Sequence, residues 1–275
     1  MLKDITFGQY FSANSFIHKL DPRAKILLLI LFIVLIFSAG NFAGLGAAAF
    51  LVVIAMLFSG IPARMYFKNL KVVIPIVIFT ALLNIFYGDP ETLLLFSFWK
   101  INIYLGGIFR AIFMTVRVIL LILISSTLTY TTTPNDLTDA IERLLKPLKI
   151  IGLVSAVHTM SMMMTIALRF IPTLIEETNK ILNAQKARGA DIESGGLVKK
   201  VKALLPILIP LLISSVRRAY ELAEAMECRC YNGGKGRKRM KTLHLSYRYF
   251  LAFFILLAFI AGVIVSNFFI TFGVI

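Results

Sequence analysis

The chain has 275 residues, of which 59% are hydrophobic and only 16% are charged, and its mean hydropathy is +0.85. A soluble domain of this size has no core that could bury so many apolar residues, and a disordered chain is far more polar, so both classes are excluded. The 29 Lys and Arg residues against 14 Asp and Glu residues give a net charge of +15, which in a membrane protein orients loops rather than binding nucleic acid. The composition predicts an integral protein of the lipid bilayer with no nucleic-acid partner.

The first 25 residues carry polar and charged side chains, including Asp4, His18 and Arg23. They lack the apolar core of a secretory signal peptide. We therefore expect the mature protein to keep its N-terminus.

Five apolar runs approach the length that a helix needs to cross a bilayer, which is about 20 residues. They predict transmembrane helices at Ile26–Ala39, Phe42–Ser59, Val72–Tyr87, Tyr104–Tyr130 and Tyr249–Phe272. Only Gly40 and Asn41 separate the first two runs, which predicts a tight helical hairpin.

The distribution of basic residues predicts the orientation of these spans. Of the 29 Lys and Arg residues, 26 precede the first span, lie between the second and third, or fall between Thr131 and Arg248. Because Lys and Arg of short loops stay on the cytoplasmic side, we expect a multi-pass membrane protein with its N-terminus in the cytoplasm and its C-terminus outside.

The segment between Thr131 and Arg248 is too long for a connector and predicts a helical domain. Thr133-Pro134-Asn135-Asp136 is typical of a helix start, and this helix would run to about Lys149. Two long helices follow, from Leu153 to Arg188 and from Gly196 to about Arg229. If both crossed the membrane, six Lys and Arg residues would lie outside, so we expect these helices at the inner surface. The fold class is an all-α integral membrane protein, divided into residues 1–130, 131–248 and 249–275.

Little in the sequence points to an enzyme. The five spans contain no Asp, Glu or His, whereas ionisable groups at membrane depth usually mark functional sites. Asn135-Asp136-Leu137-Thr138-Asp139 matches the pattern with which intramembrane prenyltransferases hold a magnesium diphosphate, but Asp at a helix N-terminus is also favoured by the helix dipole. Cys228 and Cys230 lack further ligands for a metal and are interpreted as reduced cytosolic thiols. We expect no catalytic residue, no metal and no cofactor in this chain.

Two short motifs lie 41 residues apart, Ala187-Arg188-Gly189 and Cys228-Arg229-Cys230, each at the end of a predicted long helix. Aligning them also superposes Ala184 on Ala225, which indicates a weak internal duplication. A cation is favoured in the last turn of any helix. Each Arg taken alone is therefore also explained as an ordinary helix end.

Taken together, these features resemble the transmembrane T component of energy-coupling factor transporters, the vitamin and metal importers of prokaryotes. Gly8-Gln9-Tyr10, Asn14-Ser15 and the run from His18 to Lys25 are similar to the N-terminal signature of that family. Ala184-Gln185-Lys186-Ala187-Arg188-Gly189 is similar to its first Ala-Arg-Gly motif. Glu227-Cys228-Arg229-Cys230-Tyr231, followed by Gly233-Gly234, resembles its second and looser copy, in which Cys flanks the Arg on both sides.

The resemblance implies that residues 187–189 and 228–230 dock into two cytosolic ABC-type ATPase subunits, one motif per subunit. It also implies that the membrane part holds a separate substrate-binding membrane subunit and that ATP and Mg are bound by the ATPases. The chain itself would be a non-enzymatic coupling scaffold in the cell membrane of a prokaryote.

Two further groups of residues have open interpretations. Met160, Met162, Met163 and Met164 suit a surface that accepts different substrate-binding subunits, and they equally suit gap-filling in the helical domain. Arg110 and Arg117 lie seven residues apart in the fourth span. They would meet a partner, line a polar crevice, or extend outward to the membrane surface.

We interpret the sequence as a shared coupling module for vitamin or metal uptake. One alternative is a T component dedicated to a single substrate such as cobalt, nickel or biotin. A less favoured alternative is a prenyltransferase-like enzyme that uses Asp136 and Asp139.

Overall fold

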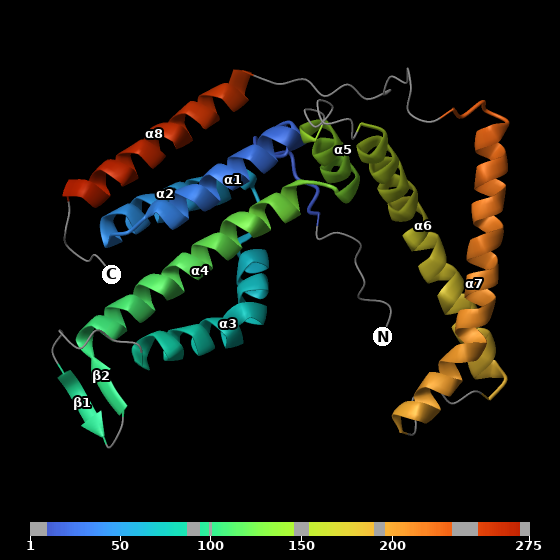
Figure 1. Cartoon of the computed structure of the whole chain (residues 1–275), viewed down its shortest axis with the longest axis horizontal. Helices are drawn as coiled ribbons and strands as arrows, with labels where there is room; N and C mark the ends of the chain where they lie inside the picture. The colour runs from blue at the N-terminus through green and yellow to red at the C-terminus, as the bar shows by residue number, and fades with distance from the viewer. Residues whose placement is uncertain are drawn as a thin grey trace. The chain divides into compact units, whose positions relative to one another are not determined.

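The computed structural model describes residues 10–86, 94–98, 101–145, 154–189, 196–232 and 247–269. Its elements in chain order are α1 (Pro22–Ser38), α2 (Phe42–Ser59), α3 (Ala63–Phe86), β1 (Leu94–Phe98), β2 (Ile101–Tyr104), α4 (Leu105–Thr131), α5 (Pro134–Leu144), α6 (Val154–Ala187), α7 (Leu197–Glu227) and α8 (Tyr247–Phe269) (Figure 1). The described residues form two compact units. We call residues 10–140 and 247–269 the bundle unit and residues 141–232 the hairpin unit, with the boundary inside α5.

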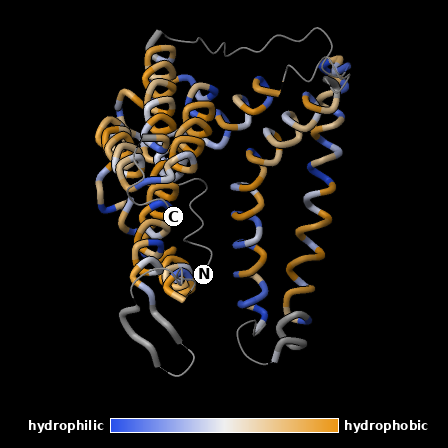
Figure 2. Tube along the Cα trace, turned by 60° about the vertical axis from the view of Figure 1, so that its left-hand side comes forward, coloured by the Kyte–Doolittle hydropathy of each residue, from blue (hydrophilic) through white to orange (hydrophobic). Residues whose placement is uncertain are grey.

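The bundle unit has a core made by α1, α2, α4 and α8. Its buried side chains include Leu35, Ile36, Val52, Phe113 and Val263. The outward faces are apolar as well, with Phe50 62% and Leu57 75% exposed, and Figure 2 shows that these helices are hydrophobic over most of their length. Large apolar side chains on an exposed helix surface are typical of contact with lipid.

The turn between α1 and α2 is fixed to the C-terminal helix. The Asn267 amide nitrogen donates to the Ser38 carbonyl (2.6 Å), and the Gly40 N–H donates to Asn267 Oδ1 (3.1 Å). A Cβ atom on Gly44 would lie 3.1 Å from Val263 Cγ1, so a larger residue there would require Val263 to move by a few tenths of an ångström. The tight hairpin predicted at Gly40 and Asn41 is confirmed, and α8 closes the bundle over it.

The connection between α3 and α4 contains two short strands that the sequence did not predict. α3 includes Pro75, and Figure 1 shows this helix bent, as proline in a helix interior requires. β1 and β2 then pair as an antiparallel ladder, with Phe98 opposite Ile101. The all-α membrane fold is otherwise confirmed by the eight helices of the described residues.

Five helical segments in the described residues are long and apolar enough to cross a membrane: Phe42–Ser59, Ala63–Phe86, Leu105–Thr131, Lys202–Glu227 and Tyr249–Phe268. The number agrees with the sequence expectation, but the set differs. α1 has 17 residues, which span only about 26 Å of a hydrocarbon core about 30 Å thick. The segment in α7 is long and apolar enough to span, whereas the charges around it predict a position at the inner membrane surface.

The predicted start of α5 is confirmed. The Asp136 N–H donates to Thr133 Oγ1 (3.1 Å), and the Thr133 hydroxyl donates to the Asp136 carboxylate (2.8 Å). Pro134 occupies the first helical position, where its missing N–H costs nothing. The described helix ends at Leu144, before the predicted limit at Lys149, which lies outside the described residues.

The hairpin unit is built from the two long helices, whose ends lie within about two residues of the predicted ones. α6 and α7 contact each other and run antiparallel (Figure 1). Tyr231, just beyond the end of α7, bonds to Met162 near the start of α6. The Arg motifs at the two helix ends therefore lie at opposite ends of the hairpin.

Candidate functional site

Arg188 and Arg229 occupy the same position in two similar helix ends. In α6 the Gly189 N–H donates to the Lys186 carbonyl (3.0 Å), and in α7 the Cys230 N–H donates to the Glu227 carbonyl (2.8 Å). The residue that follows each Arg is left-handed, with φ of 83° at Gly189 and 53° at Cys230. Each Arg is thus the last residue before the backbone turns out of the helix, and both side chains are exposed.

The α7 end is a complete Schellman motif. The Tyr231 N–H donates to the Met226 carbonyl (3.0 Å), in addition to the Cys230 bond. Cys230 holds the left-handed position that glycine usually occupies, at a cost of roughly 1 kcal/mol for a residue with a Cβ atom. Gly189 fills the corresponding position of α6 without that cost. The two motifs therefore share a backbone geometry although their flanking residues differ.

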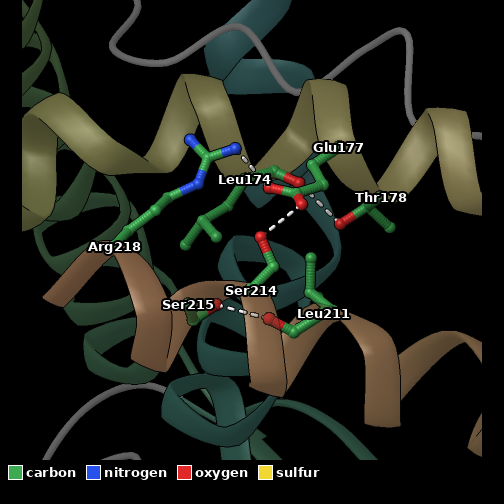
Figure 3. A network of polar contacts seen from close by, with 7 residues as sticks. All are labelled: Leu174, Glu177, Thr178, Leu211, Ser214, Ser215 and Arg218. Carbon is green, nitrogen blue, oxygen red and sulfur yellow. Dashed lines mark hydrogen bonds and ion pairs between the residues drawn. The ribbon is translucent and has the colours of Figure 1, made fainter. Parts of the chain in front are cut away.

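A cluster of polar contacts joins the two helices between these ends (Figure 3). Arg218 Nη2 donates to Glu177 Oε2 (2.6 Å), and the Ser214 hydroxyl donates to the other oxygen of the same carboxylate. The sequence alone does not predict this cluster. Its signal was nevertheless present, because Glu177 and Arg218 are separated by 41 residues, the same interval as Arg188 and Arg229.

A groove of about 500 Å³ lies beside the α7 end. Arg229 and Arg169 both line it, over an apolar wall that includes Phe170 and Leu222. The Tyr231 hydroxyl donates to Met162 Sδ (2.9 Å) at the same place. One Arg motif thus adjoins a second guanidinium, and their electrostatic potential attracts an anionic group.

The structure separates the four predicted methionines. Met160, Met163 and Met164 are 71%, 63% and 53% exposed. Met162 is half-buried and contacts Tyr231. Three of the four therefore form an outward apolar surface, and Met162 packs against Tyr231 beside the groove.

A second polar cluster, also missed, connects α5 to α6 within the hairpin unit. The Ser161 hydroxyl donates to the buried carboxylate of Glu142, and His158 Nδ1 lies 3.5 Å from the other oxygen of that carboxylate. Because a buried carboxylate needs hydrogen-bond donors, these contacts fix where α6 begins relative to α5.

The N-terminal residues singled out by the sequence form a junction at the end of α4. The buried Lys25 ammonium donates to the Thr131 carbonyl (2.7 Å), and the Phe11 N–H donates to the Tyr130 carbonyl (2.9 Å). His18 Nε2 donates to the Phe11 carbonyl (2.8 Å). Burial lowers the pKa of Lys25 from 10.5 to about 8, although the carboxylates of Asp136 and Asp21 raise it. The residues from Phe11 to Lys25 are therefore structural anchors for the point where the chain leaves α4.

The segment 135–139, which would hold a metal in the prenyltransferase alternative, lies at the start of α5. Asp136 accepts the Thr133 hydroxyl at the start of α5. Among the residues that the structure describes, no group of three His, Cys, Asp or Glu side chains is arranged to hold a metal ion.

Arg110 and Arg117 line a crevice of about 250 Å³ together with Asn84 and Gly40. Arg117 Nη2 donates to the Ala39 carbonyl at the end of α1, and its Cζ lies 4.7 Å from the centre of the Phe113 ring. Of the three interpretations left open, the structure favours the polar crevice.

Comparison with known proteins places this geometry in context. Residues 13–242 match the model of the family described as CbiQ, cobalt transport protein. A protein from Clostridium kluyveri, "Energy-coupling factor transporter transmembrane protein EcfT", is 52% identical over 252 residues, which cover 92% of this chain and 93% of that protein. Proteins with the same name from Ruminiclostridium cellulolyticum (48% identical, 90% and 91% covered) and Bacillus subtilis (42% identical, 88% and 91% covered) are similar over nearly the same length.

Proposed function

The chain belongs to the CbiQ family of cobalt transport proteins, and we propose that it is the transmembrane coupling component of an energy-coupling factor importer for a vitamin or a metal. In this role it hydrolyses no ATP itself. It transmits motion from two cytosolic ATPase subunits to a substrate-binding subunit in the membrane.

The observation that carries the proposal is the pair of exposed Arg residues at matched helix ends, Arg188 and Arg229. A guanidinium is always charged and presents a rigid fork of donors, which suits a groove lined by carboxylates. The small side chain of Ala187 and the bare backbone of Gly189 allow one helix end to enter such a groove closely. Because α6 and α7 are antiparallel, the two ends face opposite directions, and each engages its own ATPase.

The substrate-binding subunit is proposed to contact the apolar surface of the hairpin unit. Met160, Met163 and Met164 contribute flexible thioethers to this surface, and Leu208 and Leu212 of α7 are 53% and 65% exposed. Apolar surface of this extent requires lipid or a protein partner. Unbranched methionine side chains adapt to partners of different shape, which suits a module that exchanges substrate-binding subunits.

The family description favours a second candidate, a component dedicated to one metal ion such as cobalt. The names of the relatives mention the energy-coupling factor transporter and no substrate. A shared module co-purifies with several substrate-binding subunits, and a dedicated one with a single subunit.

The test is co-purification of the tagged chain from the native membrane in mild detergent, followed by reconstitution of the complex into liposomes. We expect two ATPases and at least one further membrane subunit to accompany the chain, and uptake to require ATP. A matched preparation of Arg188→Glu with Arg229→Glu should lose the ATPases. Purification of the wild-type chain without any ATPase would contradict the proposal.

A further inference from the structure

The contact between Glu177 and Arg218 joins equivalent positions of the two long helices. The interval of 41 residues that relates Arg188 to Arg229 also relates Glu177 to Arg218. In a pair of antiparallel helices related by two-fold symmetry, only residues next to the axis touch their own equivalents. The 2.6 Å ion pair therefore lies where equivalent positions of the two helices meet, and we take it as the centre of the two segments that lead to the terminal Arg residues.

The two helical segments between this contact and the terminal Arg residues, which we call the arms, are expected to be stiff. Arg188 follows Glu177 by 11 residues, and Arg229 follows Arg218 by 11 residues. Neither segment contains Pro or Gly between these residues, whereas Pro172, Pro206 and Pro210 all lie before the contact. At 1.5 Å per residue each arm is about 16 Å long, and the two Arg backbones lie about 33 Å apart along the helix axes.

We propose that Glu177 and Arg218, with Ser214, form the pivot of the coupling helices: a positioning group that holds the two arms in one register so that displacement of either tip moves both. The proposal rests on the coupling function proposed above and adds the residues that enforce it. The Glu177 carboxylate uses both oxygens, one toward Ser214 and one toward Arg218 (Figure 3). Two directional charge-assisted bonds fix the position of one helix along the other, which apolar contacts alone do not.

The exposure of the pair supports positioning rather than stabilisation. The Arg218 and Glu177 side chains are 33% and 21% exposed, and ion pairs in contact with solvent contribute little to the free energy of unfolding. Its loss should therefore leave the helices folded but free to slide or rotate against each other. ATP hydrolysis by the attached ATPases would then continue without moving substrate.

The experiment compares five single variants and one exchange in the reconstituted complex, at equal amounts in the membrane; the fifth single variant, Glu177→Gln, removes the charge at the pivot without reversing it. Glu177→Arg and Arg218→Glu each place like charges at the pivot, and the exchange Glu177→Arg with Arg218→Glu restores the pair in reverse. Glu176→Arg and Arg217→Glu are matched controls, because they make the same charge changes one residue away at exposed positions. The readouts are retention of the ATPases and substrate imported per ATP hydrolysed.

We expect both pivot variants to retain the ATPases and to import about 5-fold to 150-fold less substrate per ATP, the usual range of a coupling interaction. The exchange should recover most of this loss, and the controls should behave as wild type. Full import by either pivot variant, or failure of the exchange to recover any import, would overturn the proposal. Release of the ATPases by Glu177→Gln would also overturn it, because the pivot lies away from the docking ends. Failure of the wild-type chain to bind ATPases would instead refute the coupling function itself.

Discussion

Glu177 and Arg218 form an ion pair between equivalent positions of two helices, and each of them precedes an exposed helix-terminal Arg by 11 residues. Because of this relationship, the two Arg ends belong to one pair of helices joined at a common contact and are not two unrelated surface features. Two equivalent ends that face opposite directions support the proposed docking of two ATPase subunits. The internal duplication, weak as a sequence signal, has a physical meaning in this arrangement.

Gly189 and Cys230, which follow the two Arg residues and have positive φ, allow a test of the helix-end geometry. Cys230→Gly should raise the free energy of unfolding by about 0.5–1 kcal/mol, because glycine adopts φ of 53° without the clash of a Cβ atom. Gly189→Ala should lower it by a similar amount, since φ is 83° there although no atom lies within 4 Å of the added Cβ. Thermal unfolding in detergent measures both. Cys228→Ala, at a right-handed position, is the control and should change little.

The helix ends were predictable because their signals are local. Thr133 and Pro134 specified the start of α5, and Gly189 specified the stop of α6, each through backbone geometry that neighbouring residues determine. The end of α7 was predicted to within about two residues, but the left-handed conformation of Cys230 was not, because cysteine carries no sequence signal for it. A left-handed turn at a residue other than Gly or Asn is not recognisable from the sequence.

Lys25 predicts a specific dependence of stability on pH. Below pH 8 it is protonated in both the folded and the unfolded state, and the cost of burying the charge is fully present. Between pH 8 and 10.5 the folded protein releases the proton first, because its Lys25 pKa is about 8, so this cost, about 3 kcal/mol, is progressively relieved. The stability of the wild type relative to Lys25→Met should therefore rise from pH 7.5 to pH 10. A difference that stays constant or falls over this range, in thermal unfolding at several pH values, would contradict the burial of the charge.

The polar contacts between distant residues were not predictable from the sequence. Lys25 and Thr131 are 106 residues apart, and Glu142 and Ser161 meet only because α5 and α6 pack together. Hydropathy patterns specify which face of a helix is apolar, but not which polar side chains on two helices meet. The β1–β2 hairpin was missed for a related reason, since strands this short in a loop carry little periodic signal.

The exposed methionines predict a selective loss of one partner. Met160→Asn with Met163→Asn should weaken binding of substrate-binding subunits by about 1.5–3 kcal/mol for each side chain that becomes fully buried in the complex. The ATPases should stay attached. Met162→Asn is the comparison, because its thioether contacts Tyr231 inside the hairpin unit. Quantitative pull-down of each subunit decides the matter, and equal retention of substrate-binding subunits by wild type and the double variant would exclude the docking role.

The predicted orientation can be tested with the two native cysteines, which are the only ones in the chain and are exposed. Cys228 and Cys230 should react with a membrane-impermeant maleimide in inside-out vesicles and not in sealed right-side-out cells, because 26 of the 29 basic residues are assigned to the cytoplasmic side. Lys100→Cys in a background without native cysteines is the matched control and should show the opposite pattern. Labelling of the native cysteines from outside would require the reverse orientation.

The function proposed for the chain depends most directly on Arg188 and Arg229. If each enters an acidic groove, Arg188→Glu brings like charges together in a desolvated site, which costs about 2–5 kcal/mol of binding free energy. The single variant should impair coupling of ATP hydrolysis to uptake, and Arg188→Glu with Arg229→Glu should release both ATPases. Arg188→Lys should be intermediate, because it keeps the charge but loses the planar fork of donors.

If the two Arg side chains only complement the helix dipole, the loss is at most about 1 kcal/mol of stability and the complex stays intact. Lys186→Glu separates these explanations, because it makes the same charge change in the last turn of α6 and should leave the ATPases bound. Pull-down of tagged variants in detergent, at equal membrane abundance, measures the outcome; a double Glu variant that keeps both ATPases and full uptake would show that these residues have no part in coupling.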